Sequence, residues 1–460
     1  MTSATSSRRP PIAVRVALAG LGAALVALAF AADALLGGVP GFGPQQAILL
    51  ALGISVAALS LLPVRILANL ALAAAGIGFT LVVSEIGLRV FAGPQFAMLY
   101  RLHPSHLHEM IPGASRIFTR QPVNGGGSHR IEVNTRGFRG AELLPAGTRP
   151  RVVVYGDSFI AGEYSPLEKT FVHQLGVKLG AALGTPVEAV NAGVVSYGPD
   201  QLSVRMEEEL GWLAPDLVIV SVFADNDFGD LVRNKLFTLA PDGSLVPNEF
   251  SIAPGLESRF WMAQHSPYLY RVFARVLGSL LVHQLPPEEQ IERDLEDCRR
   301  EWREYVVEGD NTVRERMLGR YDADVSLEPE SDSARFKVRL MDGVLGRIAA
   351  IAREHDVPLL LMIIPSPVDA VEGYDLGRVD EHRHPAYQRT ALTDAVAAAA
   401  ARQGIATVNL METFRAHDAK ALYFRGGDNH WNDAGQELAA QTLADAVISR
   451  RLMRTKGQAE

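Results

Sequence analysis

The sequence predicts an α/β protein in which a doubly wound sandwich, with a parallel sheet between two layers of helices, follows three membrane-spanning helices. Two observations lead to this prediction. The first is a long apolar region that ends near residue 90. The second is a series of five short apolar strands that alternate with helices between residues 151 and 410. Apolar strands without polar alternation are typical of a parallel sheet buried on both faces.

Three apolar stretches follow one another at the N-terminus. Between residues 16 and 36 only Asp33 is charged, no charge occurs from residue 34 to residue 64, and residues 66–84 are again uncharged. About 20 helical residues cross a hydrocarbon core of roughly 30 Å. A signal peptide followed by buried helices is the alternative, but a signal peptide has only one short apolar stretch. We therefore expect a membrane domain with three transmembrane helices over residues 1–93.

The positive charges around these stretches predict their orientation. Arg8, Arg9 and Arg15 precede the first stretch, and Arg65 lies between the second and the third. The positive-inside rule then places the N-terminus and Arg65 in the cytoplasm. Three crossings leave everything after about residue 90 on the other side. For a bacterial chain we expect the inner membrane, with the remaining domain periplasmic or extracellular.

The composition limits the classes of partner and cofactor. A net charge of −8 argues against a nucleic-acid partner. The single cysteine, Cys298, cannot form an intrachain disulfide and does not indicate the redox compartment. Beside the histidines His103, His106 and His108, only Glu109 offers a further carboxylate or cysteine ligand at the spacing of a metal site. We therefore interpret the histidines as part of a solvated loop. We expect no metal and no cofactor.

The region after the membrane domain divides into a short entry segment and a large domain. Residues 94–148 are rich in Pro and Gly and predict a loop-rich entry. The expected strands belong to a domain of residues 149–455, and they lie at 151–155, 187–190, 217–223, 359–364 and 405–410. An aromatic-rich and then charged stretch at about residues 240–345 interrupts them. It predicts a helical insertion with a solvated face, or alternatively a lid or substrate platform over the strand ends that touches the membrane through its aromatic part.

Polar residues follow the first three strands, at the edge where a parallel sheet binds ligands. Ser158 comes after the first strand, Gly193 after the second and Asn226 after the third. A serine hydroxyl becomes a nucleophile when a base takes its proton. We expect the backbone N–H groups of Ser158 and Gly193 and the Asn226 amide to form an oxyanion hole. Loss of one such donor typically costs about 3–4 kcal/mol of transition-state stabilisation.

A candidate base and its orienting acid lie near the C-terminus. His430 is the candidate general base, and Asp428 can accept a hydrogen bond from its Nδ1–H and fix the tautomer. Helix capping is the alternative for Asp428, but Asn432 or Asp433 can serve as the cap. The sequence therefore predicts serine-dependent chemistry on acyl esters. The Gly-x-Ser-x-Gly elbow of α/β-hydrolases is not present around Ser158.

Four short motifs together resemble the blocks of the SGNH (GDSL-type) hydrolase superfamily. They are Gly156-Asp157-Ser158, Asn191-Ala192-Gly193, Asn226 and the Asp428/His430 pair. The resemblance implies a flavodoxin-like α/β/α sandwich with a five-stranded parallel sheet, with Ser158 as nucleophile and Asp157 as a turn-stabilising residue.

Two positions depart from the usual pattern of these blocks. Ala224 stands where the family usually has glycine before Asp225-Asn226. Asp428-Asn429-His430-Trp431 replaces Asp-x-x-His and is similar to SGNH enzymes that O-acetylate bacterial exopolysaccharides such as alginate. The segment from Val133 to Arg139 also resembles one found in membrane-anchored members, and we interpret its role as structural.

The resemblance implies an ester hydrolase or O-acyltransferase that acts through an acyl-Ser158 intermediate, and the predicted orientation makes it extracytoplasmic. We expect an O-acetyl group on a cell-envelope glycan or lipid as the substrate. A transferase with three spans would need an acyl-donating membrane partner or an unknown acyl donor. The alternative is a non-catalytic, membrane-anchored scaffold that binds glycan during polysaccharide assembly.

Overall fold

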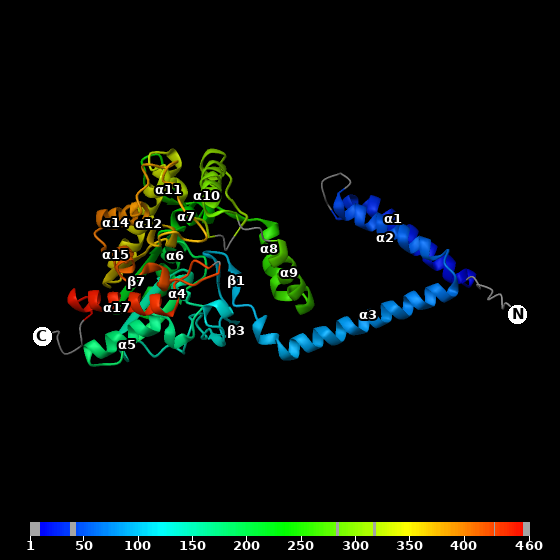
Figure 1. The fold of residues 1–460 in the computed structure, drawn as a ribbon, viewed down its shortest axis with the longest axis horizontal. Helices are drawn as coiled ribbons and strands as arrows, with labels where there is room; N and C mark the ends of the chain where they lie inside the picture. Colours follow the sequence, from blue (N-terminus) through cyan, green and yellow to red (C-terminus); the bar gives the residue numbers. More distant parts are fainter. Residues whose placement is uncertain (1–9, 37–42, 282–284, 316–318, 427, 454–460) are drawn as a thin grey trace. The chain divides into compact units, whose positions relative to one another are not determined.

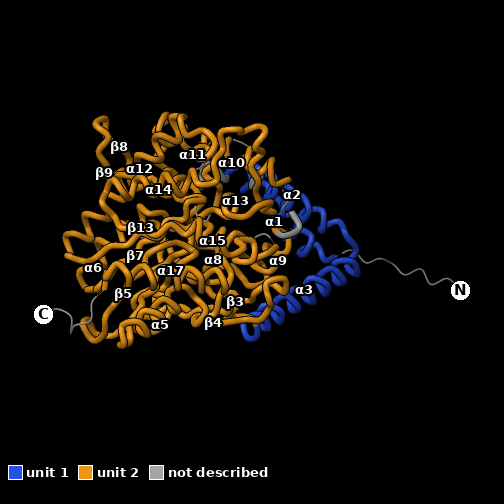
Figure 2. Tube along the Cα trace, turned by 60° about the vertical axis from the view of Figure 1, so that its left-hand side comes forward, with its two compact units in different colours: residues 1–91 blue, residues 92–460 orange. Residues whose placement is uncertain are grey.

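The computed structural model of the 460-residue chain describes residues 10–36, 43–281, 285–315, 319–426 and 428–453. It contains two compact units, residues 1–91 and residues 92–460, which Figure 2 draws in blue and orange. The first unit holds the apolar helices, and the second holds the sheet and every predicted site residue.

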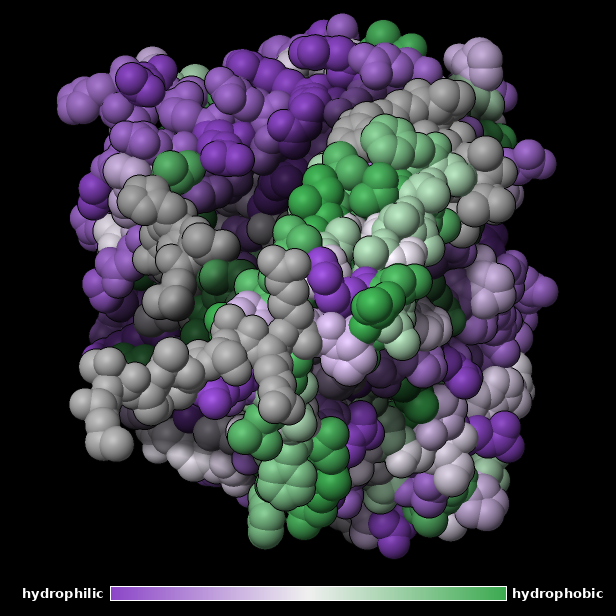
Figure 3. All heavy atoms as spheres, turned by 90° about the vertical axis from the view of Figure 1, so that its right-hand side faces the viewer, coloured by the Kyte–Doolittle hydropathy of each residue, from purple (hydrophilic) through white to green (hydrophobic). Residues whose placement is uncertain are grey.

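The first unit is built from three apolar helices: α1 (Ile12–Leu36), α2 (Pro44–Leu59) and α3 (Val64–Phe91). None of the α3 residues is buried. Figure 3 shows such side chains as green, hydrophobic surfaces. Exposed apolar surfaces of this extent are unfavourable in water and typical of helices in lipid. Glycines let α1 and α2 approach closely, since a Cβ on Gly22 would lie 2.6 Å from the Ala57 nitrogen.

Two of these helices are long enough to span a membrane, Ile12–Ala31 within α1 and Val64–Phe91. The third, α2, has 16 residues, which extend about 24 Å at about 1.5 Å each, less than a hydrocarbon core of roughly 30 Å. The expected third span is therefore a helix of marginal length. The number of crossings, and with it the side of the membrane that residues 92–460 occupy, stays a prediction. Arg8 and Arg9 lie outside the described residues.

The second unit contains the expected five-stranded parallel sheet, in the order β13-β12-β7-β5-β6. Its strands are β5 (Arg151–Gly156), β6 (Glu188–Gly193), β7 (Leu217–Phe223), β12 (Leu359–Ile364) and β13 (Ala406–Asn409). If the five strands are numbered 1 to 5 along the chain and the sheet is followed from β6 to β13, their order is 2-1-3-4-5. This is the flavodoxin-like order, which confirms the predicted fold class. The chain first adds β6 on one side of β5 and then β7 on the other. The direction in which strands are added thus reverses at β5, and ligands bind at the carboxyl ends of the strands beside such a topological switch point.

Helices cover both faces of this sheet (Figure 1). Alternate residues of β5 face the two cores, with Val152 and Val154 in one and Val153 and Tyr155 in the other. Among the helices that pack into the Val152 core are α5 (Phe171–Leu183), α15 (Met411–Ala416) and α17 (Asp433–Ser449). Among those that pack into the Val153 core are α6 (Pro199–Leu213), α7 (Asp227–Asn234), α12 (Asp332–Glu354) and α14 (Ala391–Arg402). All five strands are thereby fixed with their carboxyl ends at one edge.

The entry segment is more ordered than the sequence predicts. It forms two antiparallel hairpins, β1 (Tyr100–His103) with β2 (Leu107–Met110) and β3 (Ser115–Thr119) with β4 (Ser128–Glu132). The prediction of a solvated histidine loop is wrong, because His106 and His108 are buried. The Tyr197 hydroxyl lies 2.7 Å from His106 Nδ1, and His108 Nε2 lies 2.8 Å from the Val195 carbonyl oxygen. These partners lie about ninety residues away and leave no local signal.

The interruption between β7 and β12 is a largely helical insertion, as the sequence predicts. Its helices are α8 (Pro254–His265), α9 (Tyr268–Leu281), α10 (Pro287–Trp302), a π-helical turn (Arg303–Val307) and α11 (Ala323–Leu327). Its short strands are β8 (Phe237–Leu239), β9 (Leu245–Pro247), β10 (Ser251–Ile252) and β11 (Thr312–Val313). The core helix α12 begins at Asp332, within the stretch of about residues 240–345 that the sequence assigns to the insertion, because Ser331 caps it by accepting a hydrogen bond from Ala334 N at 3.2 Å.

Candidate active site

Ser158 lies on a sharp turn between β5 and the short helix α4 (Ser158–Ala161). Asp157 caps this helix, with its Oδ1 accepting the Phe159 N–H at 3.0 Å. Gly156 has no room for a side chain, since a Cβ would lie 2.1 Å from Ser221 Oγ. The turn thus carries the hydroxyl from the end of a buried strand to the edge of the sheet. Burial raises the pKa of Asp157 to about 6, against the opposing charge of His430.

A continuous hydrogen-bonded chain connects the three predicted catalytic residues. His430 Nε2 lies 2.6 Å from Ser158 Oγ, and His430 Nδ1 lies 2.7 Å from Asp428 Oδ1. The same carboxylate oxygen accepts the backbone N–H of His430 at 2.9 Å. The side chains of His430 and Asp428 are 16% and 18% exposed, so the chain is sheltered but open to a substrate. In this arrangement a base contacts the hydroxyl and an acid orients the base.

The turn that presents His430 is fixed on both sides. The Phe424 N–H donates to the His430 carbonyl at 2.9 Å, and the Asn432 N–H donates to the Leu422 carbonyl at 2.7 Å. Asn432 caps α17 through its side chain, as proposed from the sequence, which leaves Asp428 free to bind the imidazole. Trp431 is buried beneath the site and packs against Phe159, with ring centroids 5.1 Å apart.

Aromatic rings enclose the imidazole. The ring centroids of Phe159 and Tyr164 lie 4.8 and 4.6 Å from that of His430. Burial and the nearby charge of Asp428 raise the pKa of Tyr164, so its hydroxyl stays protonated at neutral pH. These rings reduce the access of water to the Ser158–His430 contact. Sequence reasoning did not identify Tyr164, because nothing in its local pattern distinguishes it from a core aromatic.

Gly193 lies beside the nucleophile turn, in register with Gly156 across the β5–β6 pair. The sequence suggested that the missing Cβ lets its N–H approach a substrate. In the structure the missing Cβ lets α4 pack closely, since a Cβ would lie 2.2 Å from the Ala161 nitrogen. The Gly193 N–H donates to Asn191 Oδ1 at 3.0 Å. Its role as an oxyanion donor stays a prediction, and it would have to share this hydrogen with Asn191.

Asn226 follows β7 and directly precedes α7. Its side-chain Oδ1 is buried and has no hydrogen-bond partner among the described residues. Its backbone carbonyl accepts bonds from Asp230 N at 2.9 Å and from Arg233 Nη2 at 3.2 Å. Asn226 therefore has a fixed backbone, but the unpaired atom of its side chain is an acceptor. An oxyanion would need the Nδ2 donor of this amide, so the role of Asn226 in the oxyanion hole stays a prediction.

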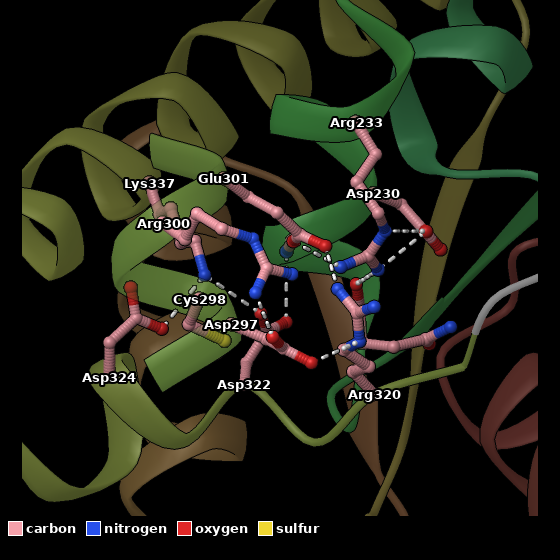
Figure 4. A network of polar contacts seen from close by, with 12 residues as sticks. Asp230, Arg233, Asp297, Cys298, Arg300, Glu301, Arg320, Asp322, Asp324 and Lys337 are labelled. Atoms are coloured by element: carbon pink, nitrogen blue, oxygen red, sulfur yellow. Dashed lines mark hydrogen bonds and ion pairs between the residues drawn. The ribbon is translucent and has the colours of Figure 1, made fainter. Parts of the chain in front are cut away.

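A buried network of charges fixes the loop around Asn226 to the insertion (Figure 4). Arg233 pairs with Asp230 at 2.7 Å and with Glu301 of α10 at 3.0 Å. Asp322 accepts the Gly229 N–H at 3.0 Å and donates its own N–H to the Asp225 carbonyl at 2.6 Å. The insertion thus stabilises the loop that carries Asn226.

Lys337 of α12, which is fully buried, joins this network through Asp322. Its Nζ lies 2.8 Å from Asp324 and 3.1 Å from Asp322. These charges raise its pKa in spite of burial, so it remains an ammonium ion. The charged stretch in the sequence gave no indication of this pairing.

Arg139 is a further contributor to the site. It is buried, with Nη1 donating to the Ala161 carbonyl at 2.6 Å and Nη2 to the Ser165 carbonyl at 2.7 Å. These bonds hold the end of α4 and so the position of Ser158. The Val133–Arg139 segment was interpreted as structural, and these contacts give that interpretation a physical basis.

Two described groups of side chains have distances suited to a metal ion, and neither lies at Ser158. One is His103, His106 and Glu109, and the other is Cys298, Asp322 and Asp324. Lys337 already supplies the positive charge in the second group. In the first, burial lowers the pKa of His106 to about 3, so its ring is neutral at physiological pH.

Two cavities, each of about 370 Å³, flank the turn that carries His430. Asn429 lines the first and Asp428 the second, and Tyr374 lines both. The first also contains Asp225, Asp294 and Tyr321. Ser158 and His430 are not among the residues that line either cavity. The two cavities reach the site through Asp428 and Asn429, and their polar and aromatic linings offer room for a hydroxyl-rich substrate next to this turn.

A family model described as "SGNH hydrolase-like domain, acetyltransferase AlgX" matches residues 329–460. The matched residues include Asp428 and His430, whereas Ser158 precedes them. No curated protein matches the chain.

Several solved structures resemble the chain at low sequence identity. An acetyl xylan esterase, AlAXEase, has 13% identity and a TM-score of 0.33, with 65% of this chain and 99% of that chain covered. A lipase/acylhydrolase from Enterococcus faecalis has 12% identity and a TM-score of 0.33, with 65% and 96% covered. A GDSL-like lipase from Bacteroides thetaiotaomicron has 13% identity and a TM-score of 0.30, with 67% and 93% covered.

Proposed function

We propose that the chain transfers O-acetyl groups of a cell-envelope glycan through Ser158. The chain belongs to the SGNH hydrolase superfamily and is an ester hydrolase or O-acyltransferase of that type. The observation that carries this proposal is the hydrogen-bonded chain from Ser158 through His430 to Asp428. A lipid O-acyl group is the second substrate class that this chemistry admits.

The proposed reaction begins with acylation of the serine. Ser158 Oγ attacks the carbonyl carbon of the acyl ester while His430 Nε2 takes its proton. Asp428 stabilises the imidazolium that forms. The Ser158 N–H, the Gly193 N–H and the Asn226 amide are the proposed donors to the oxyanion. The C–O bond to the alcohol then breaks, and His430 returns the proton to the departing oxygen.

The second half of the reaction releases the acyl group. Water or a sugar hydroxyl gives its proton to His430 and attacks the carbonyl carbon of acyl-Ser158. The bond between this carbon and Ser158 Oγ then breaks, and His430 returns the proton to Oγ, which regenerates the free serine. With water the reaction is hydrolysis, and with a sugar hydroxyl it is transfer. A transferase of this kind would receive its acyl group from a donor in or across the membrane, through an acyl-donating membrane partner.

Three features support a glycan as the substrate. The matched family model is described as an acetyltransferase domain. The Asp428-Asn429-His430-Trp431 block differs from the Asp-x-x-His spacing of most esterases of the superfamily. Tyrosines and carboxyl groups line the cleft beside the turn, and sugars bind such surfaces by stacking and hydrogen bonding. The apolar helices α1 and α3 would keep the enzyme at the envelope where such polymers are made.

The test uses the purified full-length chain and an activated acetyl ester. We expect ester cleavage, labelling of Ser158 by a fluorophosphonate probe, and a mass increase of one acetyl group on the peptide that contains Ser158. Ser158→Ala should abolish all three. Full activity of Ser158→Ala would refute the proposal. Glycan binding without turnover or labelling would instead favour a scaffold role.

A further inference from the structure

The insertion carries an exposed apolar surface on α8 and α9 that no part of the proposed chemistry uses. Six large side chains of the described residues form it: Phe273 (64% exposed), Trp261 (62%), Val276 (52%), Tyr270 (47%), Leu277 (42%) and Met262 (39%). On α9 the positions 270, 273 and 277 share one helix face, because they are three and four residues apart. We call this surface the α8–α9 face.

Helices α8 and α9 carry more basic than acidic side chains. Between residues 254 and 281 the only acidic residue is Glu257, whereas Arg259, Arg271 and Arg275 are basic. The following helix α10 is rich in acidic residues. Trp, Tyr and Phe beside arginines, on a helix that is apolar on one side, are typical of helices that lie in the headgroup region of a membrane.

Contacts within the second unit hold α9 close to the point where the chain leaves α3. Arg271 Nη1 donates to the Phe96 carbonyl at 2.8 Å, and the rings of Phe96 and Tyr268 lie 5.4 Å apart. The Arg275 guanidinium carbon lies 5.4 Å from the centroid of the same Phe96 ring. Phe96 follows the last residue of α3, Phe91, by only five positions.

Chain connectivity then limits the distance of α9 from the bilayer. The uncharged part of α3 ends at Ser84, and the helix continues for seven more residues to Phe91. Seven helical residues extend about 10 Å, which is comparable to a headgroup layer of roughly 5–8 Å on each side of the hydrocarbon core. If α3 spans the membrane, the short 3-10 turn Gly93–Gln95 keeps Phe96, and with it α9, at the membrane surface.

We propose that the α8–α9 face lies in the interface of the same bilayer that α3 spans, with its aromatic side chains among the acyl chains and the exposed arginines Arg259 and Arg275 at anionic headgroups. This second contact would limit the rotation of the catalytic unit on its tether. It would therefore hold the Ser158 site in a defined orientation relative to the membrane. The proposal does not depend on the esterase chemistry.

The test measures lipid contact directly in the full-length chain. Phe273→Cys is labelled with an environment-sensitive fluorophore and reconstituted in nanodiscs of phosphatidylethanolamine and phosphatidylglycerol. The native Cys298 is fully buried and should not react. Val177→Cys is the matched control, because Val177 is 61% exposed on α5, away from α9 in Figures 1 and 2.

We expect the label at 273 to shift to shorter emission wavelengths and to be quenched by lipids that carry doxyl groups on their acyl chains. The label at 177 should show neither effect. Equal behaviour of the two labels would overturn the proposal. A wavelength shift at 273 without doxyl quenching would also overturn it, because the face would then be covered by protein and not by lipid.

Discussion

Replacing Asp428 by Asn gives the most direct measure of the Ser158–His430–Asp428 chain. The carboxylate contacts His430 twice, at 2.7 Å to Nδ1 and at 2.9 Å to the backbone N–H. An amide oxygen can keep both hydrogen bonds but carries no charge. The substitution therefore removes mainly the electrostatic stabilisation of the imidazolium that forms during attack.

The magnitude follows from the separation and exposure of the two groups. The charges are spread over the ring and the carboxylate, so their centres are about 4 Å apart, which gives about 4 kcal/mol at an effective dielectric constant near 20. The low exposure of both side chains, 16% and 18%, favours this value over that of bulk water. About 4 kcal/mol corresponds to a decrease in kcat of roughly a thousandfold.

The assay is the steady-state hydrolysis of an activated acetyl ester by the full-length chain. Asp445→Asn is the control, because Asp445 is an exposed carboxylate on α17. We expect kcat of Asp428→Asn to fall about a thousandfold with little change in KM. In bulk water the same pair would contribute only about 1 kcal/mol. A decrease of less than about fivefold would therefore refute the assignment of Asp428 as the orienting acid.

Three further predictions concern the oxyanion donor, the buried network and pH. Asn226→Ala should raise the activation free energy by about 3–4 kcal/mol and lower kcat accordingly, with KM little changed in the same assay. Lys337→Met leaves the carboxylates of Asp322 and Asp324 buried without their cation, and should lower the free energy of unfolding in urea by roughly 3–5 kcal/mol. Burial raises the pKa of Asp225 to about 8, whereas the ordinary pKa of an aspartate is about 3.9. The folded state therefore retains the proton on Asp225. The contribution of this protonated carboxyl group to stability is lost as the pH rises through 8. Asp225→Asn should therefore reduce the loss of stability between pH 6 and pH 9.

Each of these predictions has an outcome that contradicts it. An Asn226→Ala variant with normal kcat would exclude its amide from the oxyanion hole. Equal unfolding of Lys337→Met and the native chain would mean that solvent reaches the two aspartates. An unchanged pH dependence in Asp225→Asn would show that another buried carboxyl group causes the loss, and burial also raises the pKa of Asp369, to about 7.

Much of the catalytic arrangement was predictable because each part has a local signature. Apolar runs identify the five strands, and each of the first three is followed by a short polar motif. A parallel sheet brings the carboxyl ends of its strands to one edge, so residues as far apart as Ser158 and Asn226 follow neighbouring strands. The spacing of Asp428 and His430 is likewise local. Two residues on one turn can form the 2.7 Å contact without any information from the rest of the chain.

The unpredicted features depend on partners that are distant in the sequence. His106 looked solvated because its partner, Tyr197, lies on the other side of the nucleophile motif. The first turns of α12 looked like part of a charged insertion because the aspartates that neutralise Lys337 precede the helix. The length of α2 also changed the interpretation of the membrane domain.

The sequence alone determined the fold class, the sheet edge that carries the polar motifs and the residue types gathered there, because hydrophobic periodicity and turn chemistry are local properties of the chain. Tertiary structure decided how the buried charges are paired and why Gly193 must be glycine. It also decided which surface of the insertion remains exposed. Those outcomes depend on burial and on close contacts between distant segments, and neither can be derived from the order of residues along one strand or helix.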